Sequence, residues 1–190
     1  AVTVVRRNDG RNRARRWRSA LPRCVRMPTL ILLRHAKSDY PPGVPDHDRP
    51  LSARGRRNAA TIGDQLRAFI PAEASVDVAV STAERTQQTW QIVQSDLGSP
   101  DQRWNDSALY LAEPEAIAEV SRCFDAEVGI IVGHNPGLEE LALSIPERRG
   151  AAADITIKFP TSAFAVIEFD GGDWQWAPAV ARLSAFVICR

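Results

Sequence analysis

The sequence predicts an α/β sandwich built around a mainly parallel β-sheet. Three short apolar runs, at residues 29–33, 76–80 and 128–132, have the length and continuity of strands buried on both faces of such a sheet. Segments with apolar residues at helical spacing separate these runs, and this alternation is typical of the α/β class. Near the end, the strand-like segments 164–169 and 174–180 flank an Asp-Gly-Gly-Asp turn and predict a closing hairpin.

Helices are expected between the strands. A polar, proline-rich stretch follows the first run and should be irregular, because proline disrupts regular structure. Ser52 is then a suitable N-cap for a first helix, which Pro71 ends. A second helix is expected after the second run, and a third begins at Pro114. A fourth should begin with Asn135 as N-cap and Pro136 as its first residue.

The charge is distributed unevenly along the 190 residues. Residues 1–26 hold nine arginines and one acid, a charge of +8, whereas residues 27–190 carry −7. We interpret residues 1–26 as a basic extension outside the fold, either disordered or upstream of the true start at Met27, and residues 27–190 as a single domain. An arginine-rich arm can bind nucleic acid, but the charge split alone does not establish such a partner, and none is expected.

The cysteines and the hydropathy of the sequence indicate the compartment in which the protein works. Cys24, Cys123 and Cys189 are scattered and lack the spacing of a zinc site or a disulfide framework. They suit the reducing cytoplasm. The longest apolar runs are far too short to cross a bilayer, so no membrane partner is expected.

Charged and histidine side chains follow all three apolar runs. Arg34 and His35 come directly after the first, Arg85 follows the second, and His134 follows the third. Ligands of open parallel sheets bind beyond the carboxyl ends of the strands, so these four side chains should line one crevice. A single histidine or arginine there is ordinarily a capping or solvated residue. Four at equivalent positions favour a functional site.

Together these side chains predict phosphate chemistry. Arginine forks match phosphate oxygens bidentately, and the expected helix start beside His134 adds backbone N–H donors. A neutral imidazole can attack phosphorus and hold the phosphoryl group covalently. The cationic surroundings stabilise charge on the transferring group. The scheme needs no metal and no cofactor.

Other phosphate-handling motifs are absent from the sequence. It contains no GxxxxGK loop, no GxSxG elbow and no cysteine followed by arginine at the spacing of a cysteine phosphatase. Asp46, His47 and Asp48 are adjacent, so their side chains cannot easily converge on one metal ion. We interpret this tripeptide as a solvated loop or a lip of the pocket.

With these residues identified, the chain resembles the histidine phosphatase superfamily, most closely its SixA-like phosphohistidine phosphatases. The resemblance spans about residues 29–188 in the family's order. The matching segments are 33–38, 48–51 with 54–55, 81–86 with 88–89, 132–140, 159–161 and 169–171.

The resemblance implies a three-layer α/β/α sandwich of the phosphoglycerate-mutase type and a two-step reaction. His35 would take the phosphoryl group, and water would then hydrolyse the phosphohistidine. Arg34, Arg85 and His134 would form the phosphate pocket. The resemblance also makes Ser38 and Arg49 candidates for the edge of that pocket.

One departure from the superfamily pattern bears on the substrate. Members that cleave phosphate esters place an acid near the position of residues 109–112, and this segment has none. Glu113 is the nearest acid and remains a candidate for substrate contact, with Asp39 and Asp48 as substitutes from the nearby loop. A phosphoramidate nitrogen acquires its proton more readily than an alkoxide. The missing acid therefore favours phosphohistidine, or another labile phosphate, over phosphate esters of the phosphoglycerate type.

Three functions follow from these expectations. The leading one is a phosphatase acting on phosphohistidine in a partner protein, which predicts a shallow, open site. The second is a small-molecule phosphomonoester phosphatase, which predicts a deeper pocket with Glu113 pointing into it. The third is a non-catalytic phosphate-binding module, against which the retention of all four predicted residues argues.

Overall fold

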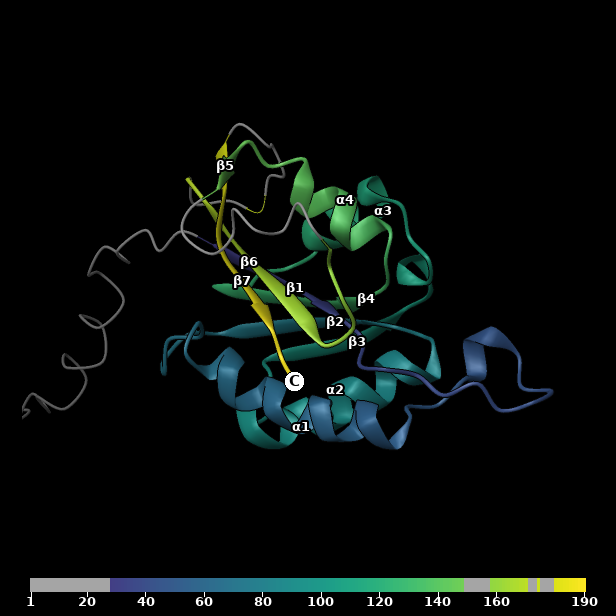
Figure 1. Cartoon of the computed structure of the whole chain (residues 1–190). Helices are drawn as coiled ribbons and strands as arrows, with labels where there is room; N and C mark the ends of the chain where they lie inside the picture. The colour runs from purple at the N-terminus through teal and green to yellow at the C-terminus, as the bar shows by residue number, and fades with distance from the viewer. Residues whose placement is uncertain (1–27, 149–157, 171–173, 175–179) are drawn as a thin grey trace, which may run out of the picture.

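The computed structural model describes residues 28–148, 158–170, 174 and 180–190 (Figure 1). The basic extension, residues 1–26, lies outside the described residues. Within them, one sheet has seven strands in the order β3-β2-β4-β1-β6-β7-β5. The strands are β1 (Thr29–Arg34), β2 (Val76–Ser81), β3 (Gln102–Asp106), β4 (Val128–Gly133), β5 (Glu147–Arg148), β6 (Ala163–Phe169) and β7 (Ala181–Ile188).

The sheet is mainly parallel, as predicted. β4 lies between β1 and β2 and pairs parallel with both, and β3 extends the parallel set beyond β2. Only β6, among the described strands, runs antiparallel to its two neighbours. The carboxyl ends of β1, β4 and β2 therefore lie side by side at one edge.

Helices cover both faces of the sheet and complete the predicted three-layer α/β/α sandwich. α1 (Ala53–Arg67) and α2 (Glu84–Leu97) lie on one face, and α3 (Pro114–Ser121) and α4 (Gly137–Leu143) on the other (Figure 1). Alternate side chains of β1 enter the two cores, one containing Ile31 and Leu33 and the other Leu30 and Leu32. No helix within the described part of the chain has the length and apolar character needed to cross a membrane.

The start of α1 fixes the loop that follows β1. Ser52 is the predicted N-cap, and its hydroxyl accepts a hydrogen bond from the Gly55 amide at 3.0 Å. The Ser52 amide in turn donates to the Lys37 carbonyl at 2.9 Å. A Cβ on Gly55 would lie 2.0 Å from that carbonyl oxygen, so only glycine permits this approach. The contact holds the segment that carries Ser38.

The second strand of the predicted hairpin lies further along the chain than expected. The partner of β6 is β7, and most of residues 174–180 lie outside the described residues. Trp174, which is described, is not in a strand: its ring packs edge-on against Phe124 and its Nε1 donates to the Ala126 carbonyl. Its apolar character therefore reflects packing in the core.

Two further predictions of local structure differ from the structure. α4 begins at Gly137 with Pro136 as N-cap, because the Asn135 amide donates to Glu139 and to the Phe159 carbonyl instead of capping the helix. The edge strand β3 was not predicted. Its residues are mostly exposed and polar, so it lacks the apolar run that identifies a buried strand.

Candidate active site

The four side chains predicted from the strand ends come together in the structure. Arg34 ends β1 and His35 follows it, Arg85 lies in the first turn of α2 after β2, and His134 follows β4. They line one cavity of about 340 Å³. The other residues of its wall are Lys37, Ser38, Tyr40, Asp46, Arg49, Leu111, Asn135 and Thr161.

His35 is held as a neutral imidazole with a free ring nitrogen. Its side chain is buried, and Nδ1 lies 2.7 Å from the Ala36 carbonyl oxygen. A carbonyl only accepts hydrogen bonds, so Nδ1 carries the proton and Nε2 keeps its lone pair. Burial, together with the charges of Arg85 and Arg34, lowers the pKa of His35 to about 3. His35 is therefore an available nucleophile at neutral pH.

His134 is oriented by a buried serine. Its Nε2 lies 2.9 Å from the Ser81 hydroxyl, and its ring centroid is 5.2 Å from that of His35. Its Nδ1 is buried and has no hydrogen-bond partner among the described residues. Burial and the neighbouring His35 lower the pKa of His134 to about 3. When the Ser81 hydroxyl donates to Nε2, Nδ1 carries a proton and can donate to a phosphate oxygen.

The two arginines keep donors available for an anion. One terminal nitrogen of Arg34 donates to the Phe159 carbonyl at 2.6 Å, and its buried Nε has no partner among the described residues. Arg85 is only 4% exposed and uses two N–H groups on Asp46, one to its carbonyl oxygen and one to its carboxylate. A guanidinium has five N–H donors, so three remain on Arg85.

The structure places some of the weaker candidates in the cavity wall and others outside it. Arg49 donates to the Ser38 hydroxyl at 2.7 Å, and both residues line the cavity. Glu113 is the exposed N-cap position of α3 and does not line it. Asp39 and Asp48, the substitutes considered for a missing acid, are exposed and are also absent from the wall of this cavity.

The carboxylate that does line the cavity is Asp46, which the sequence placed only in a possible lip of the pocket. It lies in the short 3-10 helix η1 (Asp46–Asp48) and accepts hydrogen bonds from Arg49, Arg85 and the Tyr110 hydroxyl. The order of residues gives no sign that Tyr110 would reach it from 64 positions away. The described residues contain no group of three or more histidine, cysteine or acidic side chains that could hold a metal ion.

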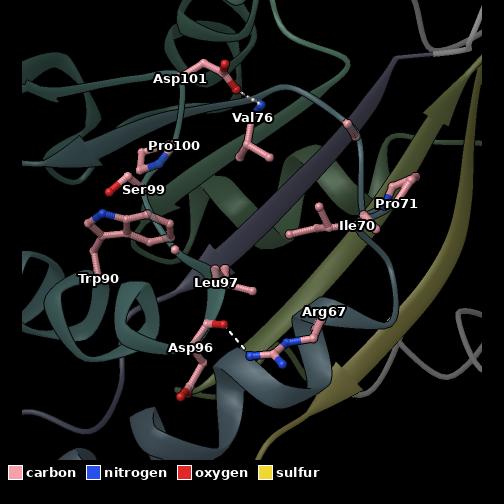
Figure 2. Close-up of a pocket in the computed structure, with 13 residues that line it drawn as sticks. Arg67, Ile70, Pro71, Val76, Trp90, Asp96, Leu97, Ser99, Pro100 and Asp101 are labelled. Carbon is pink, nitrogen blue, oxygen red and sulfur yellow. Dashed lines mark hydrogen bonds between the residues drawn. The ribbon is translucent and has the colours of Figure 1, made fainter.

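A second and larger cavity, of about 560 Å³, lies elsewhere in the fold (Figure 2). Its wall includes Val76 at the start of β2, whereas Ser81 beside the first cavity ends that strand. Asp101 accepts a hydrogen bond from the Val76 amide in this wall. None of the described histidines lines it, so the cavity lacks the nucleophile on which the predicted chemistry depends.

Comparison with known proteins finds relatives that match most of the chain. The uncharacterized protein Rv1276c of Mycobacterium tuberculosis is 37% identical over 166 residues, 83% of this chain and 100% of its own length. The SixA protein of Nakamurella multipartitia, assigned as a phosphohistidine phosphatase, superposes with a TM-score of 0.71 at 31% identity, covering 86% of this chain and 96% of the other. A SixA structure from Agrobacterium tumefaciens, with the same assignment, gives a TM-score of 0.66 at 29% identity over 84% and 97%.

Fold and structural relatives define the class as an α/β/α protein of the phosphoglycerate-mutase type. Residues 30–109 match the model of the histidine phosphatase superfamily, branch 1. The chain belongs to the histidine phosphatase superfamily, and its structural neighbours include SixA proteins.

Proposed function

We propose that this protein is a metal-independent phosphatase that removes the phosphoryl group from phosphohistidine in a partner protein through a covalent intermediate on His35. The observation that carries the proposal is the state of His35. Its Nδ1 proton is held by the Ala36 carbonyl, and its Nε2 lone pair is left free in a cavity lined by Arg34 and Arg85. Such an imidazole is prepared to attack phosphorus.

In the first step, the Nε2 lone pair of His35 forms a bond to phosphorus, and the bond from phosphorus to the substrate nitrogen breaks. The electron pair of the broken bond stays on the departing imidazole. Because Nδ1 of His35 keeps its proton, the phosphorylated ring is a cation. In the second step, water attacks phosphorus, the bond to Nε2 breaks, and His35 departs as a neutral imidazole while the water proton passes to the released phosphate.

The surrounding donors stabilise the group in transit. Negative charge on a transferring phosphoryl group is spread over three equatorial oxygens. Arg34, Arg85 and His134 line the same cavity and come from three separate strand ends. The arginines supply N–H donors, and His134 adds one from Nδ1 when Ser81 donates to its Nε2. Removal of one such donor typically lowers turnover by about 10²–10³-fold.

The surroundings of the cavity support phosphohistidine as the substrate. An ester phosphatase needs an acid that gives its proton to an alkoxide, and Glu113 does not line the cavity. Two cavity residues, Tyr40 and Leu111, expose 66% and 51% of their surface, which suits contact with a protein around a phosphorylated side chain. The SixA assignment of the solved relatives supports the same substrate.

A cytoplasmic location forms part of the proposal. Cys123 and Cys189 are both free thiols. Free thiols are typical of proteins in the reducing cytoplasm, where disulfides rarely form.

Trapping of the intermediate tests the proposal. The protein is incubated with a labile phosphoryl donor such as phosphoramidate and quenched, and the peptides are searched for a phosphate that is acid-labile and base-stable. We expect it on the peptide containing His35, and none in His35→Ala. His47→Ala is the matched control, because His47 is the remaining histidine and does not line the cavity. Full turnover by His35→Ala would overturn the proposed mechanism.

A further inference from the structure

The carboxylate of Asp46 stands at the mouth of the cavity. Its side chain is 50% exposed, whereas Arg85, which it contacts, is only 5% exposed at the side chain. His35 is buried as well, with 7% of its surface exposed. Phosphoryl transfer places the attacking and leaving atoms roughly in line on opposite sides of phosphorus. A leaving group displaced by His35 therefore departs toward the mouth, where Asp46 lies.

Asp46 is surrounded by hydrogen-bond donors, which favour its ionised form. The Tyr110 hydroxyl donates to it at 2.8 Å, Arg49 at 2.7 Å and Arg85 at 3.0 Å. These donors, the Tyr110 hydroxyl foremost, lower the pKa of Asp46 to about 2. It is ionised at neutral pH and cannot serve as the acid that an alkoxide leaving group requires.

An ionised Asp46 retains capacity for one more donor. A carboxylate has about four lone-pair sites, and the three hydrogen bonds from Tyr110, Arg49 and Arg85 occupy three of them. The exposed half of the side chain leaves room for a group that enters with the substrate.

The chemistry of a phosphorylated imidazole supplies such a donor. When one ring nitrogen carries phosphorus and the other carries a proton, the ring is a cation and departs as neutral imidazole. Without that proton the ring would have to leave as an anion. His35 is arranged in the same way. The Ala36 carbonyl keeps a proton on its Nδ1, so the ring can leave phosphorus as neutral imidazole.

We propose that Asp46 accepts a hydrogen bond from the ring N–H of the substrate's phosphorylated imidazole, keeps that ring protonated as it leaves, and thereby selects phosphoimidazoles over phosphate esters. The inference rests on the proposed function, since it requires transfer of the phosphoryl group to His35. In this role Asp46 is a catalytic residue. An ester phosphatase uses an acid that gives a proton to the leaving group, whereas Asp46 is a base that holds the proton already on the leaving ring.

The test compares two substrates whose leaving groups differ in their need for a proton. N-phosphoimidazole releases imidazole, and 4-nitrophenyl phosphate releases a phenolate that departs without protonation. In Asp46→Asn, any disturbance of Arg85 lowers kcat/KM for both substrates. We expect the fall for N-phosphoimidazole to exceed the fall for the ester by about 10- to 100-fold, the loss typical of a charged hydrogen bond. Asp48→Asn is the matched control, because Asp48 lies in the same short helix but outside the cavity wall.

Each outcome decides between the alternatives. An equal fall for both substrates would mean that Asp46 acts only by positioning Arg85, and an unchanged kcat/KM for N-phosphoimidazole would also overturn the inference. Stabilisation by inorganic phosphate in thermal unfolding checks that the pocket of the variant is intact, and Asp46→Ser serves if the asparagine variant unfolds. Wild-type protein that hydrolyses the ester but not N-phosphoimidazole would refute the proposed substrate itself.

Discussion

Acidification should destabilise this protein through the two histidines of the cavity. Burial lowers the pKa of both His35 and His134 from 6.5 to about 3 in the folded state. Between these two pH values, the unfolded chain binds protons that the folded protein excludes. The free energy of unfolding therefore falls as the pH falls below about 6.5, and the loss continues until the folded-state pKa is reached.

The size of the effect follows from the same pKa values. For each histidine, every pH step of one between the unfolded and the folded pKa removes about 1.4 kcal/mol from the free energy of unfolding, so lowering the pH from about 6.5 to about 5.0 removes about 2 kcal/mol. His35 and His134 both stay neutral over this range, so together they remove about 4 kcal/mol. That is a large fraction of the roughly 5–15 kcal/mol that typically stabilises a domain.

Urea unfolding at pH 7.5 and 5.0 measures this dependence. The wild-type protein is compared with His35→Asn, His134→Asn and the double variant. Each single variant should recover about half of the pH-dependent loss, because asparagine binds no proton in either state. If the double variant lost as much stability as the wild type, the two imidazoles would not be held neutral. The account of His35 as a free nucleophile at neutral pH would then fail.

Two further substitutions test how the fold positions the site. Ser81→Ala removes the hydrogen bond to Nε2 of His134, so we expect kcat/KM to fall about tenfold and stability to fall by about 1 kcal/mol, measured by steady-state kinetics and urea unfolding. Unchanged kinetics would show that the Ser81 hydroxyl does not orient His134. Gly55→Ala places a methyl group against the Lys37 carbonyl and should lower stability by about 1–3 kcal/mol in thermal unfolding. A variant as stable as the wild type would show that the close approach is not needed.

The fold class and the four central residues of the candidate site could be predicted from the sequence alone. The apolar runs that form β1, β2 and β4 are continuous, so they could be recognised as buried strands of a parallel sheet. Parallel strands end at a common edge, so residues that follow such runs had to meet there, however far apart they lie in the chain. For this reason Arg34, His35, Arg85 and His134 could be predicted to share one site.

The surroundings of those four residues depend on how distant parts of the chain pack together. The sequence offered Glu113, Asp39 and Asp48 as acids near the site, yet the carboxylate that lines the cavity is Asp46. Which acid of a loop turns inward depends on side chains from distant elements, here Tyr110 and the arginines that donate to Asp46.

The protonation pattern of the site was also beyond the reach of the sequence. The proton of His35 lies on Nδ1 because the Ala36 carbonyl is 2.7 Å away, and His134 is turned by Ser81 from the neighbouring strand. Periodicity and strand ends locate a residue along the chain. Hydrogen-bond partners and burial, which fix its charge and its reactive atom, exist only once the chain is folded.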